Sequence, residues 1–322
     1  MRAVWSFWSK PFSAHRNRVW ASEKHHLLSW VLSTQTAMRY YRPSVLYTDN
    51  VGARMLVDGI GLEFDEVHTT LNAISDADPH WWALGKLYAY RAQAAPFVHI
   101  DNDVFLWKAL PHDMESAPVF AQNAEPFVPG QSFYQPEAVE FALSGATKGW
   151  LPPEWLWYRQ SGRDSRGECC GVFGGNRVDF IQHYAARAIR LIEDPGNRSG
   201  LEALPDKIVH TVLVEQYLLS ACIEYCRAHR GSLYHDVAIR YLFSSIEEAF
   251  NSETATRLGY THLIADAKRN PGLTNRLEAR VVRDYPAHYE RCTEYLAQYS
   301  GLQTTEFRVG PRQVPASSKF SA

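Results

Sequence analysis

The sequence predicts an α/β protein with a central, mainly parallel sheet, and three observations support this fold class. Short apolar runs alternate with longer helical patterns through the first hundred residues. Polar or acidic residues follow several of the runs directly, as they do at the carboxyl ends of parallel strands. The length of 322 residues is enough to bury a large core. We therefore expect one domain in which helices cover the sheet.

The elements expected in the first hundred residues alternate between strand and helix. Strands are expected at residues 3–7, 45–47, 64–68 and 97–100. Helices are expected at residues 22–41, 52–58 and 79–94, the first of them with Ser22 as its N-cap. Residues 6–9, 48–49 and 101–103 follow three of the strands, so we predict that they converge on one crevice.

The second half of the chain is predicted to be helical and rich in aromatic residues. Helices are expected at 178–192 and 205–229, and a strand that runs into a turn at 172–176. Residues 161–168 are polar and are expected to form a mobile loop. Residues 302–322 are expected to be a loosely ordered polar tail. Three tryptophans could stack on a sugar, although a packed subdomain is the commoner explanation: Trp150, Trp155 and Trp157.

Composition excludes several classes of protein. The formal charge is −2, from 33 basic and 35 acidic residues, which argues against a general nucleic-acid binder. The five cysteines are odd in number and lack paired C-x-x-C spacing, which argues against a disulfide framework or structural zinc. No segment resembles a signal peptide or is apolar for long enough to span a bilayer. We expect a soluble, cytoplasmic protein without a membrane span.

The strongest candidate site is Asp101-Asn102-Asp103. The apolar run before it stops at two carboxylates, and apolar residues resume at Val104. Buried carboxylates are costly unless a cation or a donor compensates them. Alternation along a strand places Asp101 and Asp103 on one side and turns Asn102 aside. Two acids near a turn are often simply solvated, but their place between apolar runs favours a site for Mn²⁺ or Mg²⁺ and phosphate.

Two charged residues on expected helices are ambiguous. Lys86 lies off the apolar stripe of the 79–94 helix, a position typical of a solvated lysine. Glu215 lies on the apolar stripe of the 205–229 helix, with Gln216 beside it. A buried glutamate needs a partner or remains neutral. A structural ion pair with an arginine and a functional role are both open.

Histidines and a later lysine add further candidates. His262 could complete the coordination of a metal held by carboxylates. Lys268, six residues on, could neutralise a phosphate. Taken alone, a single histidine is usually a polar surface residue. His25 and His26 are expected on the surface of their helix.

Together these segments resemble the core of the GT-A-fold, nucleotide-sugar-dependent glycosyltransferases, of the type of glycogenin and the bacterial lipooligosaccharide galactosyltransferases. The similar segments are Lys86-Leu87, the apolar run 97–100 with Asp101-Asn-Asp103-Val, Glu215-Gln216, and His262-Leu-Ile-Ala-Asp-Ala-Lys268. The last is similar to a His-x-x-Gly-x-x-Lys-Pro motif, with Ala265 in place of the glycine and Arg269 in place of the proline. Glu215 stands where an aspartate is usual.

The resemblance implies a role for each matching position. Asp101, Asp103 and His262 would bind Mn²⁺, or Mg²⁺, which in turn holds the diphosphate of the donor. Glu215 and Gln216 would lie near the reacting carbon as the catalytic residues. The donor itself would be bound by Ser6, Trp8, Asp49, Lys86, Asn102 and Lys268.

The function that the resemblance implies is metal-dependent transfer of a sugar, with retention, from a nucleoside diphosphate donor such as a UDP-sugar. The acceptor could be a saccharide, a peptide or a small molecule. Residues 1–125 would form the nucleotide-sugar-binding half of a single GT-A (Rossmann-like) domain, and residues 126–301 its acceptor-side and catalytic half. The alternatives are a metal-dependent nucleotidyltransferase, a nucleotide-sugar hydrolase, and a non-catalytic protein that binds nucleotide sugars.

Overall fold

A seven-stranded, mainly parallel sheet forms the centre of the protein, as the computed structural model shows for residues 1–15, 19–145 and 149–306. The strand order is β3-β2-β1-β4-β7-β6-β8, and only β7 runs against its two neighbours. The predicted α/β class is therefore confirmed. The strands of this sheet are β1 (Arg2–Phe7), β2 (Ser44–Thr48), β3 (Glu66–His68), β4 (Phe97–Ile100), β6 (Val119–Pro126), β7 (Arg166–Gly175) and β8 (Ile239–Tyr241).

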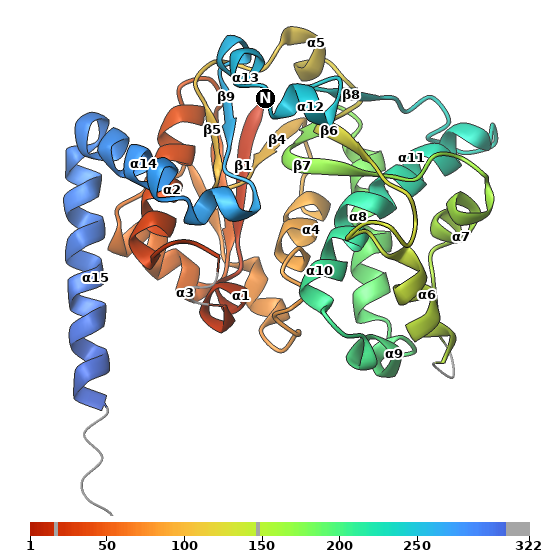
Figure 1. Cartoon of the computed structure of the whole chain (residues 1–322), viewed down its shortest axis with the longest axis horizontal. Helices are drawn as coiled ribbons and strands as arrows, with labels where there is room; N and C mark the ends of the chain where they lie inside the picture. The colour runs from red at the N-terminus through yellow and green to blue at the C-terminus, as the bar shows by residue number, and fades with distance from the viewer. Residues whose placement is uncertain (16–18, 146–148, 307–322) are drawn as a thin grey trace, which may run out of the picture.

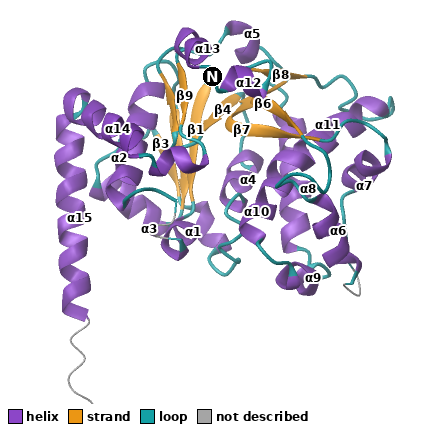
Figure 2. Cartoon of the chain, viewed as in Figure 1, coloured by secondary structure: helices purple, strands orange, loops and turns teal. Residues whose placement is uncertain are grey.

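Helices cover both faces of the sheet, so that two apolar cores form (Figures 1 and 2). Successive side chains of β1 point to opposite faces, with Val4 in one core and Ala3 and Trp5 in the other. The first core is completed by α4 (Leu84–Arg91), α8 (Val178–Glu193), α10 (Lys207–Val212), the π-helical turn η3 (Leu213–Tyr217) and α11 (Leu218–Ala228). The second core is completed by α2 (Glu23–Ala37), α14 (Pro271–Asp284) and α15 (Pro286–Glu306).

The shorter elements connect these layers. A two-stranded antiparallel sheet pairs β5 (Val104–Leu106) with β9 (Tyr260–His262) beside the main sheet. The remaining helices of the described chain are α1 (Ser9–Ala14), α3 (Asn50–Ala53), η1 (Arg54–Gly59), η2 (Thr70–Ile74), α5 (His112–Glu115), α6 (Pro136–Ser144), α7 (Pro153–Gln160), α9 (Arg198–Ala203), α12 (Ile246–Ala249), α13 (Ser252–Leu258) and η4 (Ala265–Arg269).

Most predicted elements are present, with different lengths. Ser22 caps α2 as expected, its hydroxyl accepting a hydrogen bond from the backbone N–H of His25. The predicted 205–229 helix is α10, η3 and α11 in succession, and its middle widens to a π-turn at Glu215. The prediction of a mobile loop over 161–168 is wrong for its last three residues. Arg166 begins β7, and Glu168, in the same strand, is fully buried.

The two halves of the chain share one sheet. The boundary expected at residue 125 falls inside β6, and β6, β7 and β8 extend the sheet begun by the first half. Helix α15 extends to Glu306, into the range expected for the tail, and residues 307–322 lie outside the described part of the chain. None of the helices described is long and apolar enough to cross a bilayer.

Candidate functional site

A cavity of about 450 Å³ lies at the carboxyl ends of β1 and β4. Its lining contains most of the site residues expected from the sequence: Ser6, Trp8, Lys86, Asp101, Asn102, Asp103, Gln216, His262 and Lys268. Asp49 and Glu215 do not line it. Parallel strands bring their carboxyl ends to one edge of the sheet, which explains why such distant positions meet.

A group of three potential metal ligands lies in the cavity wall. Asp101 and Asp103 occupy the turn between β4 and β5, while His262 is the last residue of β9. The pairing of β5 with β9 sets His262 opposite Val104, beside Asp103. One donor atom from each of the three residues lies within 4.8 Å of the others. Two carboxylates and an imidazole form a donor set suited to a divalent cation such as Mn²⁺.

The ring of His262 is held in one orientation. Its Nδ1 lies 2.7 Å from Oε1 of Gln122, which also accepts a hydrogen bond from the Tyr260 hydroxyl at 2.6 Å. Nδ1 therefore carries the proton, and Nε2 faces Oδ1 of Asp103 at 3.4 Å. Gly171 makes room for the ring, since a Cβ there would lie 2.5 Å from Cε1 of His262. Metal-binding histidines are commonly oriented in this way by a second hydrogen bond.

The charge around Asp103 also fits a bound cation. Burial alone would raise its pKa, but Lys268, with Nζ 2.5 Å from Oδ2, and His262 reverse the shift, so the carboxylate is ionised. Its other oxygen, Oδ1, is buried without a hydrogen-bond partner. A buried carboxylate oxygen that has no donor is an available ligand. The donor set, the oriented imidazole and this oxygen together fit a divalent cation.

Lys86 connects the carboxylate cluster to the core. The interpretation of Lys86 as a solvated lysine is wrong, because its side chain is 10% exposed and its Nζ lies 3.0 Å from Asp101 and 2.6 Å from Glu215. Burial would lower the pKa of Lys86, but the two carboxylates outweigh it and raise the pKa. Desolvation raises the pKa of Asp101 to about 6, against the opposing effect of the Lys86 ammonium.

Glu215 and Gln216 are adjacent but lie in different environments. Glu215 is fully buried, and its Oε1 accepts hydrogen bonds from Lys86 and from the Tyr90 hydroxyl at 3.1 Å. Its partner is thus a lysine, not the arginine considered from the sequence. Gln216 reaches the cavity, where the Tyr134 hydroxyl contacts its Oε1. Both residues lie in the π-turn η3, where consecutive side chains point in different directions, as in any helix.

The remaining residues expected at the donor site have structural partners. Ser6 Oγ lies 2.9 Å from Nε2 of His99, and Asn102 donates to Ser29 Oγ at 3.0 Å. Asp49 accepts hydrogen bonds from the N–H and hydroxyl of Ser9 and from the N–H of Gly52. It therefore ties the start of α1 to the start of α3.

Apart from Trp8, the aromatic wall of the cavity was not among the residues expected from the sequence. It is formed by Phe7, Trp8, Phe12, Trp20, His26 and Trp30. His26, expected on the surface, is buried and stacked on Phe12 with ring centroids 4.3 Å apart. Desolvation lowers the pKa of His26 to about 3, so the imidazole is neutral at pH 7. The alternation of apolar and polar residues in helix 22–41 contains no signal that this histidine faces inward.

The fold and the site define an α/β protein with a candidate divalent-metal site, made of two carboxylates and an imidazole, at the carboxyl ends of parallel strands. The chain belongs to a family of unknown function, DUF6734, which it matches over residues 1–295. A search of curated proteins found no match. Among solved structures it is similar to the apo structure of WbbM, a bifunctional glycosyltransferase, at 15% identity and a TM-score of 0.31. That alignment covers 66% of this chain and 37% of the WbbM chain.

Proposed function

We propose that this protein is a metal-dependent glycosyltransferase that moves a sugar from a nucleoside diphosphate donor, such as a UDP-sugar, to an acceptor. The observation that carries the proposal is the convergence of Asp101, Asp103 and His262 with two lysines in one aromatic-walled cavity. The diphosphate of a donor is bound by positive charge, and its nucleobase stacks on a flat apolar surface. This cavity offers both.

The roles follow from position. Asp101, Asp103 and His262 would hold Mn²⁺, which when bound would act as a Lewis acid on the diphosphate. The ammonium group of Lys268 is paired with Asp103 and would bind a phosphate oxygen of the donor. The aromatic wall would stack on the base. Glu215 would act through Lys86, keeping the ammonium in place, while Gln216 would face the donor sugar.

The transfer step requires the loss of a diphosphate. The bond between the anomeric carbon and the phosphate oxygen breaks, and the diphosphate leaves with the electron pair. The acceptor oxygen forms the new bond on the same face, with retention as the family resemblance implies, and its proton passes to the departing diphosphate. Fixed positive charge around the leaving group lowers the barrier to this step, each such aid being worth about 3 kcal/mol.

The proposal is tested by product analysis. The protein is incubated with UDP-glucose or UDP-galactose, Mn²⁺ and a mixture of saccharide and peptide acceptors. A transferase releases UDP and a glycosylated acceptor, and NMR of the product gives the anomeric configuration. Release of pyrophosphate would assign a nucleotidyltransferase instead, and free sugar alone would assign a hydrolase. Binding of UDP without any turnover would leave only a nucleotide-binding protein.

A further inference from the structure

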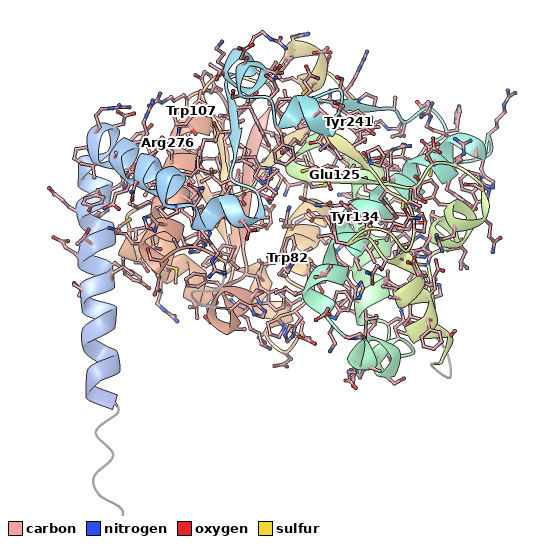
Figure 3. All side chains as sticks on the ribbon, in the orientation of Figure 1. Trp82, Trp107, Glu125, Tyr134, Tyr241 and Arg276 are labelled. Carbon is pink, nitrogen blue, oxygen red and sulfur yellow. The ribbon has the colours of Figure 1, made fainter. Side chains whose placement is uncertain are left out.

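A second group of residues in the cavity lining carries polar groups that neither the metal nor the diphosphate uses. This second wall consists of Trp82, Glu125, Cys169, Ile208 and Gln216. Trp82 and Glu125 are labelled in Figure 3. Cys169 and Ile208 contribute no charge. The chemistry of this wall therefore depends on one indole ring, one carboxylate and one carboxamide.

Glu125 is fixed by a buried tyrosine. The Tyr134 hydroxyl donates to its Oε2 at 2.6 Å, and Tyr134 itself is 1% exposed. Burial, and then the Glu125 charge, raise the pKa of Tyr134 well above its usual value, so the hydroxyl keeps its proton. No lysine, arginine or histidine among the described residues forms an ion pair with Glu125. Its second oxygen is therefore an acceptor available to a ligand.

The same hydroxyl also contacts Gln216, so the carboxylate and the carboxamide are held side by side. The single proton of the Tyr134 hydroxyl is shared between Oε2 of Glu125 and Oε1 of Gln216, which leaves the NH₂ group of Gln216 as a donor. Trp82 completes the wall. Its indole N–H donates to the carbonyl of Ile208 at 3.2 Å, so the polar edge of the ring is satisfied, and the partly exposed ring lines the cavity.

We propose that this wall is the acceptor subsite and that the acceptor is a saccharide. The inference rests on the proposed function, because it takes the aromatic wall to hold the nucleotide. A pyranose presents adjacent hydroxyls, each both donor and acceptor, and an apolar face of C–H groups. Glu125 accepts from one hydroxyl, Gln216 donates to another, and the ring of Trp82 packs on the apolar face.

A cationic acceptor such as a lysine side chain fits this wall less well. The Lys86 ammonium already lies over the Trp82 ring, 5.9 Å from its centroid, so a second cation would have to share that ring with it. The amide donor of Gln216 would also have no partner on an ammonium group, which has no acceptor. The combination of a donor, an acceptor and an aromatic face therefore favours hydroxyl groups.

Saturation-transfer NMR on the full-length protein tests the subsite directly. The probes are methyl α-D-glucopyranoside, methyl β-D-galactopyranoside, maltose and lactose, with N-acetyl-lysine methylamide as the cationic comparison. Each is added with and without UDP and Mn²⁺. We expect at least one glycoside to bind, and Trp82→Leu or Glu125→Ala to weaken its binding at least fivefold. Trp82→Phe should retain most of the binding, because it keeps an aromatic face.

Controls separate this inference from the proposed function. Val209→Ala alters a neighbouring residue outside the cavity lining and should leave glycoside binding unchanged. The thermal shift with UDP and Mn²⁺, measured on the same samples, reports the donor site independently. Glycoside binding without any nucleotide effect would refute the proposed function and leave the saccharide subsite standing. The inference would be overturned if no glycoside bound, or if only the lysine probe bound. It would also be overturned if Trp82→Leu and Glu125→Ala bound the glycoside as tightly as wild type does.

Discussion

Nζ of Lys86 lies 2.6 Å from Oε1 of Glu215, and both groups are buried between the cavity and the core. Ion pairs in such places are costly to break, because the remaining charge has no solvent to compensate it. The pair therefore links the stability of the fold to the geometry of the site.

Removing the lysine should destabilise the protein strongly. Lys86→Met leaves the carboxylates of Asp101 and Glu215 without their shared cation, and we expect a loss of about 3–5 kcal/mol in the free energy of unfolding. Glu215→Gln should lower the free energy of unfolding less, because Lys86 retains its ion pair with Asp101. Urea denaturation measures both. Adding Glu215→Gln to Lys86→Met should lower the free energy of unfolding little further, or raise it. If the losses of the two single variants simply added up in the double variant, the two residues would not be coupled.

A methyl group at Gly171 should disturb the metal site through His262. A Cβ there would meet Cε1 and Nδ1 of His262 at 2.5 and 2.6 Å and Oε1 of Gln122 at 2.7 Å. We expect Gly171→Ala to lower Mn²⁺ affinity, measured by electron paramagnetic resonance, with about 1–3 kcal/mol lost in stability. Gly231→Ala is the matched control, since a Cβ at Gly231 meets nothing within 4 Å. Equal Mn²⁺ affinity in the two variants would remove His262 from the metal site.

The hydrogen bond behind His262 gives a milder change at the same place. Gln122→Leu removes the acceptor that fixes the proton on Nδ1 of His262. We expect Mn²⁺ affinity to fall about 10–100-fold, the range found when the partners of metal ligands are removed. Tyr260→Phe, which removes only the second bond to Gln122, should weaken Mn²⁺ binding less. An unchanged Mn²⁺ titration in Gln122→Leu would contradict this orientation of the imidazole.

The ion pair of Asp78 with Lys207 should make stability depend on pH. Burial alone would raise the pKa of Asp78, but Lys207, 2.8 Å away, and the hydrogen bonds from His80 lower it to about 2. A lowered pKa stabilises the fold above the unfolded value near 4, and that contribution is lost as the pH falls toward 2. Asp78→Asn should therefore cost about 1 kcal/mol at pH 7, since partial exposure screens the pair.

Urea denaturation between pH 2 and pH 7 checks the sign of this effect. The difference between wild type and Asp78→Asn should shrink as the pH falls from 4 to 2. Asp76→Asn, at an exposed acid two residues earlier, should show no such trend. A difference that stayed constant or grew toward acid pH would contradict the assignment.

The parts of the fold that depend on local sequence were predictable. The apolar run of β4 and the acids that end it lie within seven residues, so the sequence located the carboxylate pair. The cap of α2 is equally local. The exposure of residues on helix α4 was harder to predict, because the helix is buried on most sides. Lys86 lies off the single stripe that the pattern revealed, yet it is covered by residues from β7 and η3.

The parts that depend on distant contacts were not predictable from pattern. His262 reaches Asp103 only because β9 pairs with β5, and no signal in either short strand identifies its partner. The family resemblance, rather than periodicity, brought His262 into the predicted site. Glu125 and Trp82 were missed because a carboxylate near a strand end and an indole near a helix start have no distinctive spacing. Trp155, considered for sugar stacking, is instead buried against Tyr217.

The most direct test of the account is the thermal shift produced by UDP with and without Mn²⁺ in wild type, Asp103→Asn and the surface control Asp113→Asn. The substitution by asparagine keeps the shape of the side chain and removes the charge. We predict that UDP stabilises wild type and the control only when Mn²⁺ is present, and that Asp103→Asn folds but loses this response. An equal Mn²⁺-dependent shift in Asp103→Asn would contradict the proposal that this carboxylate holds a cation against a diphosphate.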